Sequence, residues 1–185
     1  PPKIRELARE IMVDPGEIKI AISKPAENIL QVAYSVFDNQ KVKLVEHLLD
    51  GKGLKSVLIF CSTKKAVNIL ERNLSKLKGL TSASISSDHD QKKREQIMLD
   101  FKNQKINVLV ATDLVSRGID IANIELVINY DIPNDAEDYV HRIGRTARAD
   151  TDGMAITLIS PDEQHKFRRI EQLIDDAESM RLSFM

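Results

Sequence analysis

The sequence has no tryptophan, one cysteine and few aromatic residues, and these absences exclude several kinds of site. Aromatic residues make up 4% of the 185 residues, so a platform for stacking nucleic-acid bases is poorly provided for. The single cysteine, Cys61, cannot form an intramolecular disulfide and suits a reducing compartment. Its place after the apolar run 57–60 predicts a buried, inert thiol. With 4 scattered His residues and no HExxH pattern, no metal site is predicted.

The chain also lacks an excess of charge and any long apolar run. Lys and Arg number 27 against 28 Asp and Glu, so any site for a polyanion must be a local cluster. No apolar stretch approaches the roughly 18 residues that span a bilayer, and no signal-peptide pattern is seen. A cytoplasmic location without membrane contact is therefore expected. The sequence opens on Pro1-Pro2 instead of Met, which suggests a piece of a longer protein.

Extended and helical patterns alternate along most of the chain. The predicted strands are about 30–36, 57–61, 82–85, 108–111, 126–130 and 155–159. The predicted helices are about 40–50, 63–77, 90–102, 135–143 and 161–177. This alternation predicts an α/β domain with a mainly parallel sheet and helices on both faces, because right-handed crossovers leave few other topologies.

A short helix and a connector are predicted ahead of this domain. Apolar residues recur at helical spacing from Ile4 to Ile11, and Asp14-Pro15-Gly16 ends the helix. Residues 14–28 have little periodicity and are predicted to be extended. The compact domain is expected to begin near Ile29.

Three arginines spaced by three residues stand out in the segment 141–148, HRIGRTAR, which contains no acid. A solvated basic face is one interpretation. Gly144 predicts that the helix ends there, so that Arg145 and Arg148 project from a loop. The segment also follows a predicted strand, where ligands of parallel sheets collect. Arginine suits a phosphate ligand because its planar fork donates two parallel hydrogen bonds.

A second candidate segment, 111–120 (ATDLVSRGID), directly follows the predicted strand 108–111. Its Ser, Asp and Gly residues are also typical of helix caps and turns, and that alternative stays open. Capping does not require the Arg117-Gly118 pair. A glycine allows the backbone to approach a ligand closely.

Together the two segments resemble motifs V and VI of the DEAD-box RNA helicases. The first segment contains the pattern TDxxxRGxD, and the second contains HRIGR followed by a fourth basic residue, Arg148. Val57–Thr63 resembles motif IV, and Gln91 with Arg94 resembles the QxxR element of motif IVa. Ala147 stands where many relatives carry Gly. The resemblance covers nearly the whole chain, and the bacterial RhlE-like subgroup is expected to be nearest.

The resemblance implies a RecA-like, three-layer α/β/α fold for residues 29–185, the helicase C-terminal domain. Residues 1–13 would be a helix from the end of the first helicase domain, and residues 14–28 the interdomain linker. Partners would be that N-terminal RecA-like domain of the same parent chain and single-stranded or duplex RNA, gripped by its sugar-phosphate backbone. The isolated chain is expected to be monomeric and inactive.

The resemblance also implies residue roles. Arg145 and Arg148 would be catalytic arginine fingers at the γ-phosphate of ATP, and Asp120 would bind its ribose. His141 and Arg142 would couple the nucleotide cleft to the RNA side and to the first domain. RNA contacts would come from Thr63, Gln91, Arg94, Thr112, Arg117 and Gly118.

ATP and Mg²⁺ would be bound mainly by the first domain, because this chain has no GxxxxGK[ST] loop. Gly51-Lys52-Gly53 is similar to the end of that loop pattern. However, Gly53 stands in place of the required Ser or Thr, and Glu46 stands in place of the first Gly. A tight turn is therefore predicted at 51–53. The acidic run 175–178 lies on a predicted amphipathic helix and is interpreted as a solvated face.

Two other functions stay open. The second alternative is a stand-alone RNA- or protein-binding module. The pattern argues against it, because such a module would not require both arginine fingers and an acidic residue that binds ribose. A related helicase acting on DNA is the third alternative, since discrimination would depend on contacts to the 2′-hydroxyl.

Overall fold

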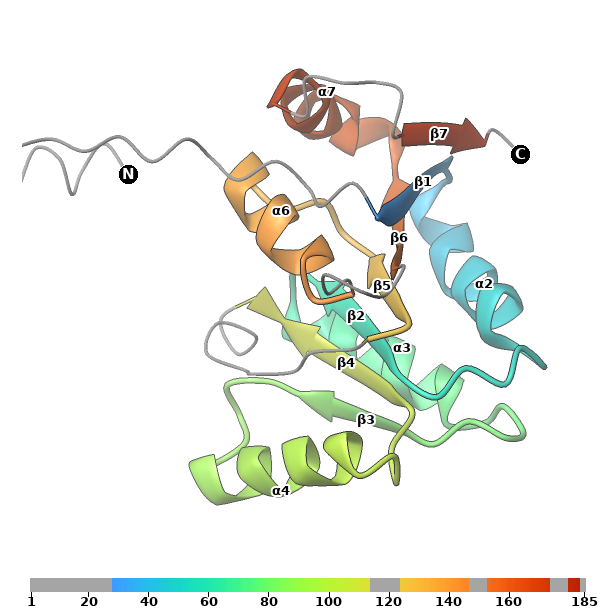
Figure 1. Cartoon of the computed structure of the whole chain (residues 1–185), viewed down its shortest axis with the longest axis vertical. Helices are drawn as coiled ribbons and strands as arrows, with labels where there is room; N and C mark the ends of the chain where they lie inside the picture. The colour runs from blue at the N-terminus through green and yellow to red at the C-terminus, as the bar shows by residue number, and fades with distance from the viewer. Residues whose placement is uncertain (1–27, 114–123, 147–152, 174–179, 184–185) are drawn as a thin grey trace, which may run out of the picture.

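The computed structural model describes residues 28–113, 124–146, 153–173 and 180–183. In these residues seven strands form one sheet, in the order β3-β4-β2-β5-β6-β1-β7, and each pairing is parallel (Figure 1). The strands are β1 (Ile29–Ser35), β2 (Val57–Cys61), β3 (Ser82–Ile85), β4 (Val108–Thr112), β5 (Leu126–Asn129), β6 (Gly153–Ile159) and β7 (Met180–Ser183). The helices are α2 (Asp38–Leu49), α3 (Lys64–Leu74), α4 (Gln91–Lys102), α6 (Ala136–Ile143) and α7 (Gln164–Leu173), with a 3-10 turn, η1 (Pro161–Glu163).

Three adjacent inner strands of the sheet are buried along their whole length. β2, β4 and β5 read VLIFC, VLVAT and LVIN, and all their residues are buried. Continuous apolar runs of this kind are typical of parallel strands that are covered on both faces. The sequence therefore places these strands in the interior of a three-layer domain.

Alternate side chains of the strands pack against different helices. Val57 and Ile59 lie in one cluster with apolar residues of α2 and α3. Leu58 and Phe60 point to the opposite face, where Phe101 of α4 joins them. On that face α6 and α7 also cover the strands β1 and β6 (Figure 1). This arrangement confirms the predicted α/β fold with helices on both faces of a parallel sheet.

Some predicted boundaries are wrong. The helix predicted over 63–77 ends at Leu74, where Asn73 Nδ2 donates to Ile69 O and Ser75 Oγ donates to Arg72 O, in competition with the helical pattern. β7 was not predicted; it is a four-residue strand that pairs with β1 at the edge of the sheet. The predicted turn at 51–53 is confirmed, since Gly51 and Gly53 both have φ of 67°.

Several predictions fall outside the described residues: the helix in 1–13, most of the connector 14–28 and the acidic run 175–178. In the part of the chain that the structure describes, no helix is long and apolar enough to cross a membrane.

Candidate nucleotide and RNA interface

Predicted RNA-contact residues gather where three neighbouring strands end. Thr63 follows β2, Thr112 is the last residue of β4, and Gln91 begins the helix after β3. β4 lies between β3 and β2, with Cys61 level with Thr112. The carboxyl ends of these strands thus bring three separate segments to one edge of the sheet (Figure 1).

Thr63 is the N-cap of α3. Its Oγ1 accepts a hydrogen bond from Ala66 N at 3.1 Å, and the helix therefore begins at the next residue. A hydroxyl can accept and donate at once, so capping leaves Thr63 able to donate to a phosphate oxygen. Lys64, beside it, pairs with Asp88 in the loop before α4, which links the segments of Thr63 and Gln91.

Gln91 and Arg94 lie in the first turn of α4. Gln91 is exposed, and its Nε2 donates to Glu95 Oε1 at 2.9 Å. Arg94 is partly exposed, yet its Nε atom is buried and has no hydrogen-bond partner in the part of the chain that the structure describes. A buried donor without a partner costs about 1–3 kcal/mol. An acceptor such as a phosphate oxygen would relieve that cost.

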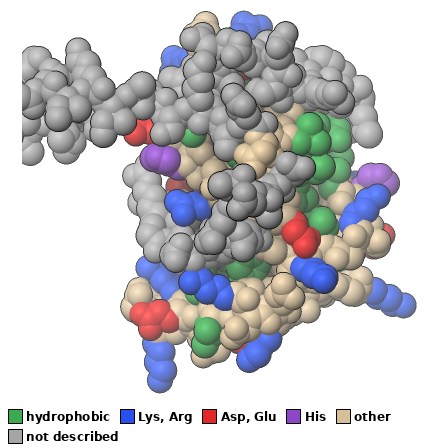
Figure 2. Space-filling model, viewed as in Figure 1, with side chains coloured by type: hydrophobic (Ala, Val, Ile, Leu, Met, Phe, Trp, Pro, Cys, Tyr) green, Lys and Arg blue, Asp and Glu red, His purple; other side chains and the backbone are tan. Residues whose placement is uncertain are grey.

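Lysine and arginine side chains surround this region. Lys92 and Lys93 of α4 are exposed beside Arg94, and Figure 2 shows Lys and Arg side chains spread over the lower part of the molecule, around α4. The net charge of the whole chain is −1. α4 itself has four basic and two acidic residues, so a modest local excess of positive charge lies on this helix.

The two motif segments meet through Arg142 of α6 and Asp113. Arg142 Nε donates to Asp113 Oδ1 at 2.7 Å, and Nη2 donates to Oδ2 at 2.6 Å. This is the bidentate geometry in which a guanidinium holds a carboxylate most specifically. The contact ties α6 to the residue that follows Thr112, across 29 residues of sequence.

Arg142 uses the rest of its guanidinium inside the domain. Nη1 donates to Asn129 Oδ1 at 3.0 Å and to Asp131 O at 2.8 Å, and the group lies 5.0 Å from the centre of the Phe60 ring. The residue is 3% exposed. Arg142 is therefore a positioning residue for α6 and for Asp113, the residue after β4. Its predicted role in interdomain coupling remains a proposal.

Arg145 does not lie where the sequence placed it. The octapeptide was expected at the carboxyl ends of the strands, but α6 runs back along the sheet, and Arg145 O accepts a hydrogen bond from Ile124 N, ahead of β5. Thr146 Oγ1 likewise donates to Ile124 O at 2.6 Å. Arg145 is thus at the opposite edge from Thr63. The expectation was wrong for Arg145 because it ignored the length of α6, whereas Arg142 of the same segment lies at the carboxyl edge, against Asp113 and Asp131.

The end of α6 agrees with the prediction. The helix stops at Ile143, and Gly144 is its C-cap. Arg145 is partly exposed and His141 is exposed. The other predicted site residues lie outside the described residues: Arg117, Gly118, Asp120 and Arg148.

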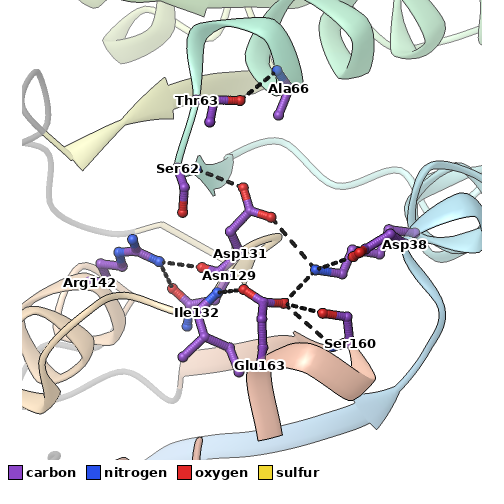
Figure 3. A network of polar contacts seen from close by, with 11 residues as sticks. Asp38, Ser62, Thr63, Ala66, Asn129, Asp131, Ile132, Arg142, Ser160 and Glu163 are labelled. Carbon is purple, nitrogen blue, oxygen red and sulfur yellow. Dashed lines mark hydrogen bonds and ion pairs between the residues drawn. The ribbon is translucent and has the colours of Figure 1, made fainter. Parts of the chain in front are cut away.

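An ionic cluster around a buried lysine at the carboxyl edge was not predicted. Lys41 of α2 is 1% exposed, and its Nζ lies 2.7 Å from Glu163 Oε2, 3.2 Å from Asp38 Oδ1 and 3.6 Å from Asp131 Oδ1. Figure 3 labels these three acidic residues. Burial by itself lowers the pKa of Lys41, but the hydrogen bond and charge of Glu163, with Asp131 and Asp38, outweigh it and raise the pKa above 10.5. Lys41 is therefore charged at neutral pH.

Two patterns in the sequence could have indicated this cluster. Lys41 shares the buried stripe of α2 with Val45 and Leu49 at a spacing of four, so a cation stands in an apolar position. Ser160-Pro-Asp-Glu163 has the spacing of a capping box, which the structure contains. Neither pattern shows that Lys41 of α2 and Glu163 of the capping box contact each other.

Comparison with known proteins identifies the family. Residues 40–150 match the model of the helicase conserved C-terminal domain. The chain is 40% identical over 173 residues to the DEAD-box ATP-dependent RNA helicase CshA of Bacillus licheniformis, covering 93% of this chain and 35% of that protein. It therefore spans about a third of the length of the curated relatives it matches.

Solved structures of DEAD-box proteins agree with this family assignment. The Escherichia coli DEAD-box protein SrmB, crystallised with the regulator of ribonuclease activity A, has a TM-score of 0.77 at 30% identity, covering 85% of this chain and 91% of that one. Yeast Dbp5 bound to RNA and ADP BeF3 has a TM-score of 0.82 at 26% identity, covering 100% and 49%. The RhlE-like subgroup stays a prediction. The chain belongs to the helicase conserved C-terminal domain family and, within it, is the C-terminal, RecA-like domain of a DEAD-box protein.

Proposed function

We propose that this chain is the C-terminal half of an ATP-dependent RNA helicase, whose ATP hydrolysis drives RNA duplex unwinding or remodelling of RNA–protein complexes. Residues 29–185 form the domain, 14–28 the linker and 1–13 the last helix of the first domain. That first domain supplies most of the contacts to ATP and Mg²⁺, so this chain alone does not hydrolyse ATP. The related CshA carries the name ATP-dependent RNA helicase.

The observation that supports this proposal best is the bidentate contact between Arg142 and Asp113. It joins the two sequence segments to which the proposal assigns different ligands. Residues 141–148 carry the fingers, and residues 111–120 carry RNA and ribose contacts. A basic surface helix without function would have no need to bury an arginine against the loop after β4.

The two ligands belong at opposite edges of the sheet. RNA is bound through phosphates at the carboxyl edge by Thr63, Gln91, Arg94, Thr112, Arg117 and Gly118. ATP lies near Arg145, at the amino ends of β5 and β6, with Asp120 at the ribose. His141 and Arg142 couple the two sites, Arg142 by holding Asp113 and α6 together.

The fingers act on charge that develops during phosphoryl transfer. Arg145 and Arg148 donate to the γ-phosphate oxygens when the first domain closes over the nucleotide. Their guanidinium groups stay charged when water is expelled, and the planar fork matches two oxygens at once. Their contribution is greatest in the transition state, so it accelerates turnover more than it tightens binding.

The test is steady-state ATPase of the two-domain parent at saturating RNA, with ATP binding measured separately. Arg145→Ala and Arg148→Ala should each lower turnover on the order of 10³-fold while leaving ATP affinity within a few-fold. Arg145→Lys should restore only part of the rate, because an ammonium lacks the fork.

Near-normal turnover in both variants would refute the proposal. Residues 141–148 would then be an ordinary basic surface, and a stand-alone binding module would be the better description. Arg168→Ala is the matched control, since Arg168 is an exposed arginine of α7 that the proposal does not use.

A further inference from the structure

Lys41 belongs to none of the segments assigned to RNA or ATP, yet its contacts lead to one of them. Its side chain is 1% exposed, so it cannot touch RNA itself. Three carboxylates converge on its amino group: Asp38 from α2 itself, Asp131 from the second residue after β5, and Glu163 from η1. Lys41 also lies 5.5 Å from the centre of the Tyr130 ring.

Asp131 uses its two oxygens in opposite directions. Oδ1 faces Lys41 at 3.6 Å, and Oδ2 accepts a hydrogen bond from Ser62 N at 2.7 Å. Ser62 is the residue before Thr63, so one carboxylate connects the buried lysine with the loop that begins α3. Figure 3 shows Asp131 between Ser62 and the point where the contacts of Asp38 and Glu163 meet.

Glu163 binds the residue that follows Asp131, Ile132. Its Oε1 accepts from Ile132 N at 3.0 Å, and its Oε2 accepts from Ser160 Oγ at 3.0 Å as well as from Lys41. Asp131 and Glu163 are thus kept close together by the cation between them. Without Lys41 their charges would repel, and Asp131, which is 19% exposed, has a route to solvent.

We infer that Lys41 is a positioning residue for the RNA-backbone surface: by holding the Asp131 carboxylate it fixes the Ser62–Thr63 loop at the carboxyl end of β2. The inference rests on the proposed RNA-binding function and adds to it a residue that contacts no RNA. Movement of Asp131 would release the Ser62 amide and change the direction in which the Thr63 hydroxyl points.

The first test needs no RNA. Amide hydrogen exchange of Ser62 is compared between Lys41→Met and Lys43→Met; Lys43 is exposed on the same helix and serves as the matched control. In Lys41→Met the protection factor of the Ser62 amide should fall by at least about tenfold more than the protection factors of the core amides of β4. The reason is that a hydrogen bond to a carboxylate is lost locally. An equal fall at Ser62 and in β4 would mean that Lys41 only stabilises the whole domain, and would overturn the inference.

The second test is a double-mutant cycle on binding of a labelled oligouridylate by the 185-residue chain. Lys41→Met should weaken binding about three- to tenfold, and much less once Thr63→Ala is present, because both changes remove the same contact. Lys41→Met and Arg94→Ala should be additive. The salt dependence of binding should stay unchanged in Lys41→Met, since no phosphate contact of a cation is lost.

Additive effects of Lys41→Met and Thr63→Ala, or unchanged affinity, would overturn the inference while leaving RNA binding by the wild type intact. No oligouridylate binding by the wild type would instead refute the proposed function, and the inference with it. If Lys41→Met does not fold, Lys41→Met/Glu163→Gln takes its place in both tests, because it removes the cation together with one of its anionic partners.

Discussion

At the scale of single residues, Arg142 uses its hydrogen-bond donors inside the domain. It holds Asp113, Asn129 and the carbonyl of Asp131. Removing one partner of a buried charge pair is far more costly than removing an exposed charge, because the remaining group is left buried and unpaired.

Arg142→Ala should therefore lower the free energy of unfolding by about 3–5 kcal/mol, as measured by urea denaturation of this chain. Arg168→Ala, on the exposed side of α7, should change it by no more than about 0.5 kcal/mol. Similar values for the two variants would show that the Asp113 contact contributes little to stability.

Cys61 offers a second test at this scale. The residue is 0% exposed, and burial, with the nearby Asp131 carboxylate, raises the pKa of its thiol well above the ordinary value. A thiol that is neither accessible nor ionised does not react with iodoacetamide. Alkylation of the native chain at neutral pH should be limited by unfolding and should accelerate in step with urea-induced loss of structure. Fast alkylation under native conditions would contradict the predicted inert thiol.

At the scale of elements, α6 connects the two proposed sites. It begins after Asp131 at the carboxyl edge and ends at Ile143 near the amino edge, where Arg145 and Thr146 contact Ile124. Thr146 Oγ1 also accepts from Met154 N at 3.2 Å. The segment after α6 is thus fixed to the starts of β5 and β6.

Gly153 makes this junction possible. A Cβ added there would lie 2.6 Å from Thr146 Cγ2 and 2.8 Å from the Thr146 backbone. Gly153→Ala should displace the segment that carries Arg145, lower the free energy of unfolding by about 1–3 kcal/mol and reduce ATP turnover in the two-domain parent.

Met154→Ala is the control for this prediction, because Met154 is the next residue in β6 and is 38% exposed. Unfolding and turnover are measured for both variants. Full stability and turnover in Gly153→Ala would show that the junction tolerates displacement.

At the scale of the whole molecule, a net charge of −1 coexists with a modest excess of basic residues on α4, which has four basic and two acidic residues. Binding through that region should be weak, indifferent to base sequence and sensitive to salt, because phosphate contacts release counterions and read no bases. Titrations of this chain with several unrelated single-stranded RNAs at two salt concentrations test this. Arg94→Ala should weaken all of them alike; a strong preference for one sequence would exclude backbone recognition.

Much of the fold and of the site was determined by local sequence. Continuous apolar runs such as 57–61 and 108–111 predict buried parallel strands because both faces of those strands need cover. Gly144 predicts the end of α6 because glycine is unfavourable inside a helix. The motif spacing also indicated which segments carry the candidate ligand contacts, and the family match agrees with that resemblance.

Tertiary structure decided what joins these segments. The contact of Arg142 with Asp113 spans 29 residues, and that of Lys41 with Glu163 spans 122; neither separation leaves a periodic signal. Lys41 appears in the sequence as one polar residue in an amphipathic helix. Asp38 lies one turn away on the same helix, but only packing brings Asp131 and Glu163 to the lysine. The edge of the sheet on which Arg145 lies was likewise set by the length and direction of α6, because a helix that returns along a sheet carries its last residues to the opposite edge.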